Sequence, residues 1–259
     1  MAQPVLTYYD IADSITAFSS TRHGGVSAGN YGEFNINEYC GDSADHIATN
    51  RAALCEELGI ELSHLIMPHQ VHGIEVRQIG EEFLNLPESI RKMVLEGVDG
   101  VMTTLSGVCI GVSTADCIPV LLHDEAHHAV CAVHAGWRGT VKRIVIKAIA
   151  EMRAAYHTEP SELKVCIGPG ISMESFEVGQ EVYQEFQEAA FPMERISRKY
   201  DKWHIDLWEC NRIQLMETGV KPENIQLTGI CTYAHADEYF SARRLGVESG
   251  RIFTGILMK

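Results

Sequence analysis

Four short stretches in the middle of the chain carry its clearest pattern of apolar and polar positions. Two of them alternate apolar with polar residues, and two are apolar runs with a histidine at or near the end. Alternation predicts a half-buried strand, and a short continuous run predicts a strand buried on both faces. The four predicted strands are residues 108–113, 118–123, 129–135 and 163–167. His134 would then lie near the end of one strand, and Cys117 in the turn between two others.

Four other segments repeat apolar residues with the period of a helix. In one of them Val141, Ile144 and Met152 fall on a single stripe, and Thr140 is placed to cap the first turn. The predicted helices cover residues 43–59, 140–156, 179–190 and 206–218, the first ending at Gly59 and the last capped by Asp206 and stopped by Gly219. Glycine just after the last turn is a common helix end.

The remaining apolar stretches complete a mixed pattern. Residues 65–79 are broken at Pro68 and then look extended, and residues 225–232 and 251–257 read as closing strands. The chain has no linker, repeat or low-complexity stretch. We therefore predict an α/β (α+β) fold, a single domain over residues 1–259 with mixed β-sheets flanked by helices.

Composition excludes several classes of protein. The net charge of −14 argues against nucleic-acid binding, which relies on a basic surface, and disfavours anionic membranes. The start has no basic cluster followed by an apolar run, and no stretch reaches the ~20 apolar residues that span a bilayer. The eight cysteines are scattered without a CxxC pair, so we expect reduced thiols in a cytoplasm.

Two histidines and a cysteine stand in short segments rich in turn residues and ionisable groups. They are His72 after His69-Gln70, Cys117 after Asp116, and His134 before Gly136-Trp137-Arg138-Gly139. Two imidazoles and a thiolate can hold a zinc ion and leave its fourth position open for a reactant. The same atoms suit a thiol nucleophile, Cys117, with His134 as its base. Turn histidines near a proline and a structural cysteine are the simpler interpretation of each segment alone.

Asp116 bears on the choice between metal and nucleophile. An adjacent carboxylate raises the pKa of a thiol, whereas a zinc ion removes the thiol proton outright, which favours metal ligation by Cys117. Asp116 is itself a candidate acid or base, or a group that orients a histidine. If residues 69–73 are extended, His69 and His72 point to opposite faces, and Gln70 shares the face of His72.

Arginines beside small residues are candidates for binding an anionic substrate in this acidic chain. Arg22 lies in a glycine-rich loop near the start, and Arg243 and Arg244 lie near the end, with Arg251 after them. Arg138 follows a strand and precedes a helix start, a place where backbone amides can also hold a phosphate. Surface ion pairs explain any one of these arginines equally well.

Taken together, these segments resemble the YfiH-type family, also called the multicopper polyphenol oxidoreductase or laccase-domain family. The resemblance runs from about residue 16 to the C-terminus, and its most specific parts are the ADC and HAGWRG segments. The matching stretches are residues 21–27, Asn35, Gly41-Asp42, Asn50-Arg51, Val71-His72-Gly73, Val98-Asp99-Gly100, residues 114–120, residues 134–139, residues 167–171, residues 176–179 and residues 241–244. Phe176 stands where a tyrosine is common, and Ala242 where an aromatic residue is common.

The resemblance implies one zinc ion per chain, held by His72, Cys117 and His134. It also implies a purine nucleoside phosphorylase for adenosine, inosine and methylthioadenosine, with adenosine deaminase activity in the same pocket. Nucleoside and phosphate are then the partners, and the candidate substrate-binding residues are Asn35, Arg22, Arg138, Arg243 and Arg244. Cys117, Asp116 and His134 are the candidate catalytic residues.

The older laccase name implies copper and phenol oxidation, which the residues do not favour. A laccase needs several copper centres with histidines in HxH arrangements, and no HxH occurs in the chain. A single site with one thiolate suits zinc better than copper in a reducing compartment. The alternatives that stay open are a metal-free Cys–His hydrolase acting on an amide or ester, and a non-catalytic zinc-stabilised binding protein.

Overall fold

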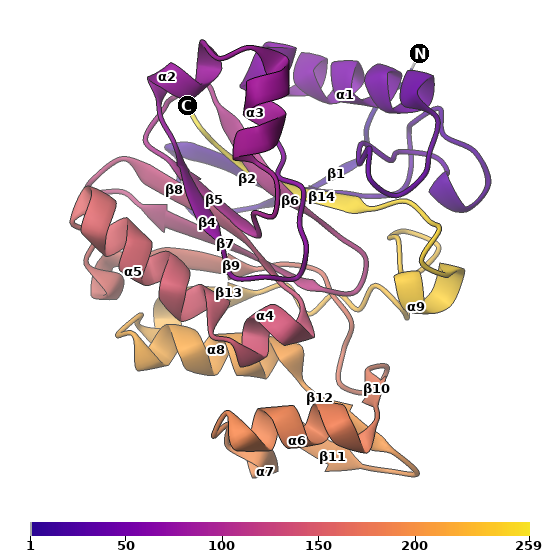
Figure 1. The fold of residues 1–259 in the computed structure, drawn as a ribbon, viewed down its shortest axis with the longest axis vertical. Coiled ribbons are helices and arrows are strands. Elements are labelled where there is room, and N and C mark those ends of the chain that lie inside the picture. The colour runs from indigo at the N-terminus through magenta and orange to yellow at the C-terminus, as the bar shows by residue number, and fades with distance from the viewer. Residues whose placement is uncertain (1) are drawn as a thin grey trace.

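The computed structural model describes residues 2–259, and its strands form two large sheets and one small one (Figure 1). The first large sheet has the order β1 (Leu6–Tyr9), β2 (Ile15–Ser20), β14 (Ile252–Met258), β6 (Cys109–Thr114) and β3 (Leu65–Ile66). The second has the order β13 (Ile225–Leu227), β9 (Lys164–Ile167), β7 (Ile118–Asp124), β8 (Ala129–Ala135), β5 (Gly100–Thr103) and β4 (Val76–Ile79). The small sheet is β10 (Glu177–Val178), β12 (Trp203–Ile205) and β11 (Ser197–Lys199).

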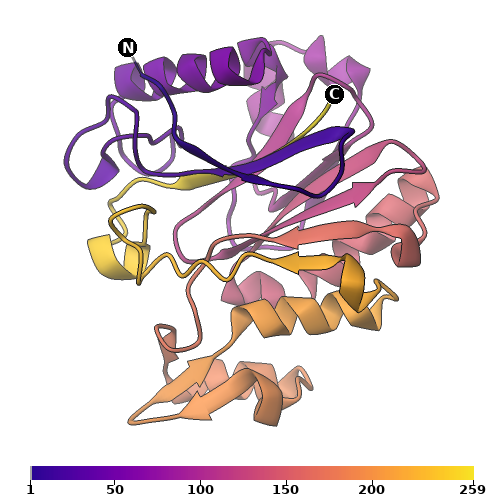
Figure 2. The same cartoon turned by 180° about the vertical axis from the view of Figure 1, so that it is seen from behind.

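The helices lie outside the large sheets or beyond their ends (Figure 2). They are α1 (Ala44–Leu58), α2 (Glu81–Leu84), α3 (Glu88–Val94), α4 (Trp137–Val141), α5 (Ile144–Tyr156), α6 (Gln180–Glu188), α7 (Met193–Ile196), α8 (Leu207–Glu217) and α9 (Ala242–Leu245). Short 3₁₀ turns occur at Gly29–Tyr31, Leu62–His64, Pro160–Glu162 and Pro222–Asn224. Among residues 2–259, no helix has both the length and the apolar character that crossing a bilayer requires.

The two large sheets pack face to face and make the centre of the molecule. Val112 and Ile256 of the first sheet share one buried cluster with Leu121 and Ala132 of the second. The outer face of the first sheet is covered by α1, and that of the second by α5 and α8. Burial on both faces explains why β7 and β8 consist entirely of buried residues, as their apolar runs predict. β6 is also buried throughout, although its alternating pattern predicts a half-buried strand.

The mixed α/β fold expected from the sequence is confirmed, and so are most of its elements. The first predicted helix is α1, preceded by Ser43 and ended by Gly59 with φ 66°. The fourth is α8, where the Asp206 carboxylate accepts a hydrogen bond from the Glu209 amide. Capping residues are local signals, so these boundaries are readable without knowledge of the rest of the fold.

Three predicted elements differ from the structure. Residues 140–156 form two helices, because Arg143 adopts a left-handed conformation (φ 64°) between α4 and α5, and Thr140 lies buried inside α4 instead of capping it. The predicted strand 225–232 stops at Leu227. Residues 69–73 are not one extended segment, because His69 forms a parallel bridge with Glu96 and the chain then bends at His72 (φ 60°) and Gly73.

Candidate metal centre

His72, Cys117 and His134 meet at one point although three separate segments carry them. His72 lies in the turn between β3 and β4, Cys117 in the turn between β6 and β7, and His134 in β8. One ligand atom from each residue lies within 4.8 Å of the other two. The β6–β7 turn also carries the chain from one large sheet to the other, so Cys117 stands where the two sheets meet.

A buried carboxylate, Asp99, fixes two of these segments relative to each other. Its Oδ1 accepts hydrogen bonds from His134 Nδ1 at 2.7 Å and from the His72 amide at 3.0 Å. Its Oδ2 accepts from the Gly73 amide at 2.7 Å and the Val71 amide at 3.2 Å. Asp99 has no exposed surface. Because Nδ1 of His134 is engaged, its Nε2 is left to face the other two side chains, the arrangement that metal-binding histidines generally show.

The absence of a side chain at Gly136 makes room for the three groups. A Cβ there would lie 2.9 Å from Cδ2 of His72 and 3.0 Å from Sγ of Cys117. Both distances are at or below the closest approach of real Cβ atoms, so a larger residue would displace a ligand. Gly136 also caps α4, which places this constraint next to the helix that follows β8.

The electrostatics of the group favour a thiolate. Burial alone would raise the pKa of the Cys117 thiol, but the neighbouring imidazoles of His134 and His72 outweigh it and lower the pKa to about 6. Burial would lower the pKa of His134, but the Cys117 thiolate and the Asp99 carboxylate raise it to about 9. Burial opposes ionisation of Asp99 as well, and its bonds to His134 and the backbone amides lower its pKa.

This donor set fits a divalent metal. Two imidazoles and a thiolate are borderline to soft ligands that suit zinc, and three protein ligands leave one coordination position open. The thiol already tends to lose its proton, and Asp99 holds His134 in the tautomer that ligation needs. The exposure of the three residues falls from His72 through Cys117 to the buried His134, so the group is open on one side.

That open side faces a cavity of about 320 Å³, which we call the metal cavity. Besides the three residues it is lined by Asn37, Tyr39, Cys40, His69, Gln70, Ser113, Thr114, Ala115, Ala242, Val247 and Arg251. The Gln70 side chain is fixed there by two hydrogen bonds with the backbone of Ser113, at 2.7 Å and 2.8 Å. The expectation that Gln70 shares the face of His72 on an extended segment was wrong in its geometry, yet both residues border this cavity.

Asp116 adjoins the centre but its carboxylate turns elsewhere. Oδ1 accepts from the hydroxyl of Thr232 and Oδ2 from the amide of Arg243, each at 2.7 Å. These bonds tie the Cys117 turn to the start of α9 across more than a hundred residues. The carboxylate that orients a metal-binding histidine is therefore that of Asp99, and a role for Asp116 as acid or base stays a prediction.

The five predicted substrate-binding residues are dispersed, and none of them lines the metal cavity. The Arg22 guanidinium donates to the carbonyls of Gly32 and Ala236, at 2.9 Å and 2.6 Å. Arg138 is exposed and lies over the ring of Trp137. Their roles toward a substrate stay predictions.

The other three predicted substrate-binding residues are Asn35, which is held by hydrogen bonds inside the protein, and Arg243 and Arg244, which lie on the surface. The buried Asn35 accepts a hydrogen bond from the Arg251 amide at 3.1 Å and donates one to Asp42 at 3.0 Å. Arg243 and Arg244 are exposed in α9, directly after the cavity-lining Ala242.

Sequence reasoning missed the stacking of Tyr39 on His69, whose ring centroids lie 3.9 Å apart. It named Arg251 only as one of several arginines that could bind an anion, and Arg251 is the one arginine among the residues that line the cavity. Asp99 was noted only within a matching stretch. The sequence around Asp99 and around Arg251 gives no local sign of these contacts, because their partners His134 and Asn35 lie far away along the chain.

Comparisons with known proteins identify the family of the chain. The family described as multi-copper polyphenol oxidoreductase laccase matches residues 16–259. A purine nucleoside phosphorylase of Bacteroides thetaiotaomicron is 46% identical over 248 residues, 95% of this chain and 92% of that protein. The adenosine deaminase RL5 of an unknown prokaryotic organism is 40% identical over 258 residues, 98% of each chain.

A solved structure extends the comparison to three dimensions. The crystal structure of YlmD from Geobacillus stearothermophilus superposes with a TM-score of 0.89 at 28% identity, covering 97% of this chain and 94% of that one. The match of sequence family and fold over nearly the whole chain leaves no large segment outside the resemblance. The chain therefore belongs to the multi-copper polyphenol oxidoreductase laccase family, the YfiH-type family.

Proposed function

We propose that this protein is a zinc-dependent purine nucleoside phosphorylase, acting on adenosine, inosine and methylthioadenosine, with adenosine deaminase activity in the same cavity. The observation that carries the proposal is the convergence of His72, Cys117 and His134 beside a cavity of about 320 Å³. Pockets of about this volume hold small-molecule ligands. Relatives named purine nucleoside phosphorylase and adenosine deaminase support it.

The chain's own groups account for how such a site would be kept ready. A zinc ion held by the three side chains would supply a Lewis acid and an activator of water. Asp99 keeps the proton of His134 on Nδ1, and its bonds to the amides of residues 71–73 hold the His72 turn in place. Two hydrogen bonds between the Gln70 side chain and the Ser113 backbone hold this part of the cavity wall in place next to the metal ligands.

The same proposal assigns phosphate binding to Arg22, Arg138, Arg243 and Arg244, with Asn35 supporting the substrate. Arg243 and Arg244 are the best placed of these, because the residue before them lines the cavity. Arg251 adds a positive charge inside it. In a chain of net charge −14, positive charge at or near the cavity is what an anionic reactant requires. A cytoplasmic location accords with eight free thiols.

The test begins with the metal content of the purified protein. Zinc-loaded protein is then incubated with inosine or adenosine, with and without phosphate, and hypoxanthine, adenine and inosine are followed by chromatography. We expect base release that depends on phosphate, and conversion of adenosine to inosine without it. Both should be lost on chelation and restored by zinc. Failure to release base under every condition would remove the phosphorylase activity from the proposal.

The lowered pKa of Cys117 next to His134 also favours a second candidate, a metal-free Cys–His hydrolase of amides or esters. That enzyme would keep its activity in the presence of chelators and lose it to a thiol alkylator. Alkylation alone does not separate the two candidates, because it also removes a metal ligand. Zinc content with ligand binding but no turnover would instead identify a metal-stabilised binding protein.

A further inference from the structure

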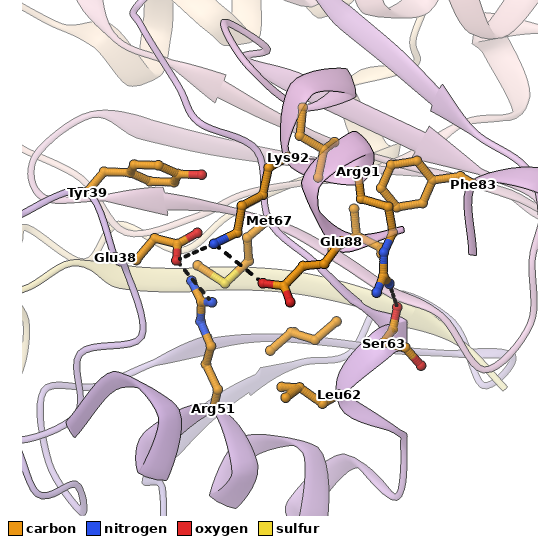
Figure 3. Close-up of a pocket in the computed structure, with 13 residues that line it drawn as sticks. Glu38, Tyr39, Arg51, Leu62, Ser63, Met67, Phe83, Glu88, Arg91 and Lys92 are labelled. Atoms are coloured by element: carbon orange, nitrogen blue, oxygen red, sulfur yellow. Dashed lines mark hydrogen bonds and ion pairs between the residues drawn. The ribbon is translucent and has the colours of Figure 1, made fainter. Parts of the chain in front are cut away.

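A second cavity of about 380 Å³ lies on the other side of the segment that carries Tyr39 (Figure 3). We call it the α3 cavity. It is bounded by α1, by the 3₁₀ turn Leu62–His64 and by α3, and its lining residues are Glu38, Tyr39, Arg51, Leu62, Ser63, Leu65, Ile66, Met67, Phe83, Glu88, Arg91, Lys92 and Leu95. Tyr39 borders both cavities, whereas Glu38 lines only this one and Cys40 only the metal cavity.

The α3 cavity combines an apolar floor with a charged rim. Ile66, Phe83 and Leu95 are buried beneath it, and Leu62 is exposed at its edge. Around the rim, Lys92 Nζ lies 3.3 Å from Glu38 and 3.4 Å from Glu88, and Arg51 Nη1 lies 3.8 Å from Glu38. Figure 3 shows these side chains reaching toward one another from α1, α3 and the residue before Tyr39.

Arg91 stands apart from this network. Its Nη1 donates to the backbone carbonyl of Ser63 at 3.2 Å, and its Nε is shielded from water without a hydrogen-bond acceptor. Among residues 2–259, no carboxylate lies within 4.0 Å of its guanidinium, whereas Arg51 has one such partner and Lys92 has two. The rim therefore has three cationic side chains against two carboxylates, an excess of positive charge in a chain whose net charge is −14.

Because the Arg91 guanidinium has no carboxylate partner and borders an apolar floor, we infer that the α3 cavity is a second ligand site for a small organic anion with an apolar body. The anionic group of the ligand pairs with the Arg91 guanidinium and the Lys92 ammonium group. Its apolar body packs on Phe83 and Leu95. A guanidinium binds carboxylate and phosphate oxygens alike by charge-assisted hydrogen bonds, so the shared chemistry is an anionic oxygen group. The volume suits a ligand of this size.

The test titrates the zinc-loaded full chain with three probes of equal apolar body. These are 3-phenylpropanoate, 2-phenylethyl phosphate and the neutral 3-phenylpropanamide, followed by ligand-observed NMR and calorimetry. We expect saturable binding of at least one anion, on the order of tenfold tighter than that of the amide. The anion that binds more tightly assigns the natural ligand to carboxylates or to phosphate esters. Absence of saturable binding by both anions, or equal binding of the amide, overturns the inference.

Variants locate the site. Arg91→Gln should weaken the anion about tenfold, to the level of the amide, while Arg153→Gln should leave its affinity unchanged. Arg153 is the matched control, because it is also near the end of a helix (α5) and lies outside the cavity. Cys117→Ala should retain the binding. Loss in Cys117→Ala would move the anion to the metal cavity and overturn the inference, as would an unchanged affinity in Arg91→Gln.

Discussion

The metal cavity and the α3 cavity share the segment around Tyr39 but are built in opposite ways. In the metal cavity, short side chains project from strand ends and tight turns, and the buried Asp99 fixes the His72 turn and His134 through four hydrogen bonds. In the α3 cavity, long side chains of α1 and α3 meet in partly exposed ion pairs. Metal chemistry needs fixed geometry, whereas adaptable arginines and lysines suffice to hold a ligand.

The largest expected effect is that of Cys117→Ala. Removing the thiolate leaves two imidazoles, so the bound zinc should fall from about one per chain to near zero, and turnover should fall by more than ~100-fold. Metal analysis and the nucleoside assay measure both. Cys40→Ala is the control, since Cys40 lines the same cavity outside the ligand group and should keep its zinc. Full zinc content in Cys117→Ala would remove the cysteine from the centre.

Asp99→Asn should weaken zinc binding by about 10- to 100-fold, the usual result of losing the carboxylate behind a metal-binding histidine. In the variant, the side-chain NH2 group would also face the backbone N–H groups of Val71 and Gly73, which donate to a carboxylate oxygen in the native protein. Competition with a chromogenic chelator measures the affinity. The control is Asp124→Asn, because buried Asp124 accepts from His127 Nδ1 at 2.9 Å away from the metal centre. Equal affinities in the two variants would contradict the role given to Asp99.

Gly136→Ala tests the spacing of the ligands instead of their support. A methyl group would come within 3.0 Å of His72 and Cys117, so one ligand must move, and zinc affinity should fall about tenfold. Gly107→Ala has a positive φ but open space around it, and should cost stability by about 1 kcal/mol without changing the affinity for zinc. Thermal melts and chelator competition separate the two effects.

Alkylation of the metal-free protein should distinguish two thiols of the same cavity. The pKa of Cys117 is about 6, so its thiolate fraction and its reaction rate should rise through pH 6 and level off above pH 7. Burial raises the pKa of Cys40, so its rate should still be rising at pH 9. Mass spectrometry of labelled peptides gives both profiles. A Cys117 rate that keeps rising above pH 8 would show that the imidazoles do not stabilise its thiolate.

The smallest effect is expected at the rim of the α3 cavity. Glu38→Gln removes the carboxylate shared by Arg51 and Lys92, and the free energy of unfolding should change by less than about 1 kcal/mol, because partly exposed pairs contribute little. Chemical denaturation measures it. A loss of several kcal/mol would show that this rim is as rigid as the metal centre and would erase the contrast between the two cavities.

Most helices and strands of the fold were predictable from local sequence patterns. The apolar runs of β7 and β8 reveal burial on both faces, and Gly59 and Asp206 mark helix ends through their own chemistry. The break at Arg143 could not be read in this way, because a non-glycine residue takes a left-handed conformation only where tertiary contacts stabilise it. The turn at His72 is a similar case, since the carboxylate that accepts its amide lies in a distant segment.

The ligand residues were identifiable because each stands in a segment with unusual chemistry and a specific family resemblance. Their convergence within 4.8 Å is a property of the fold. Asp116 attracted attention by being next to Cys117, yet its bonds go to Thr232 and Arg243. Asp99, which holds His134, comes from a strand start whose sequence shows only an acidic residue before a glycine. Proximity along the chain is a poor guide to which carboxylate serves a site.

The four hydrogen bonds of Asp99 have one more consequence. They join protein groups alone, so the support of the His72 turn and of His134 does not depend on a bound ion. We therefore expect the His72 turn and His134 to keep their positions in the metal-free protein, with only the Cys117 thiolate left to adjust when an ion binds.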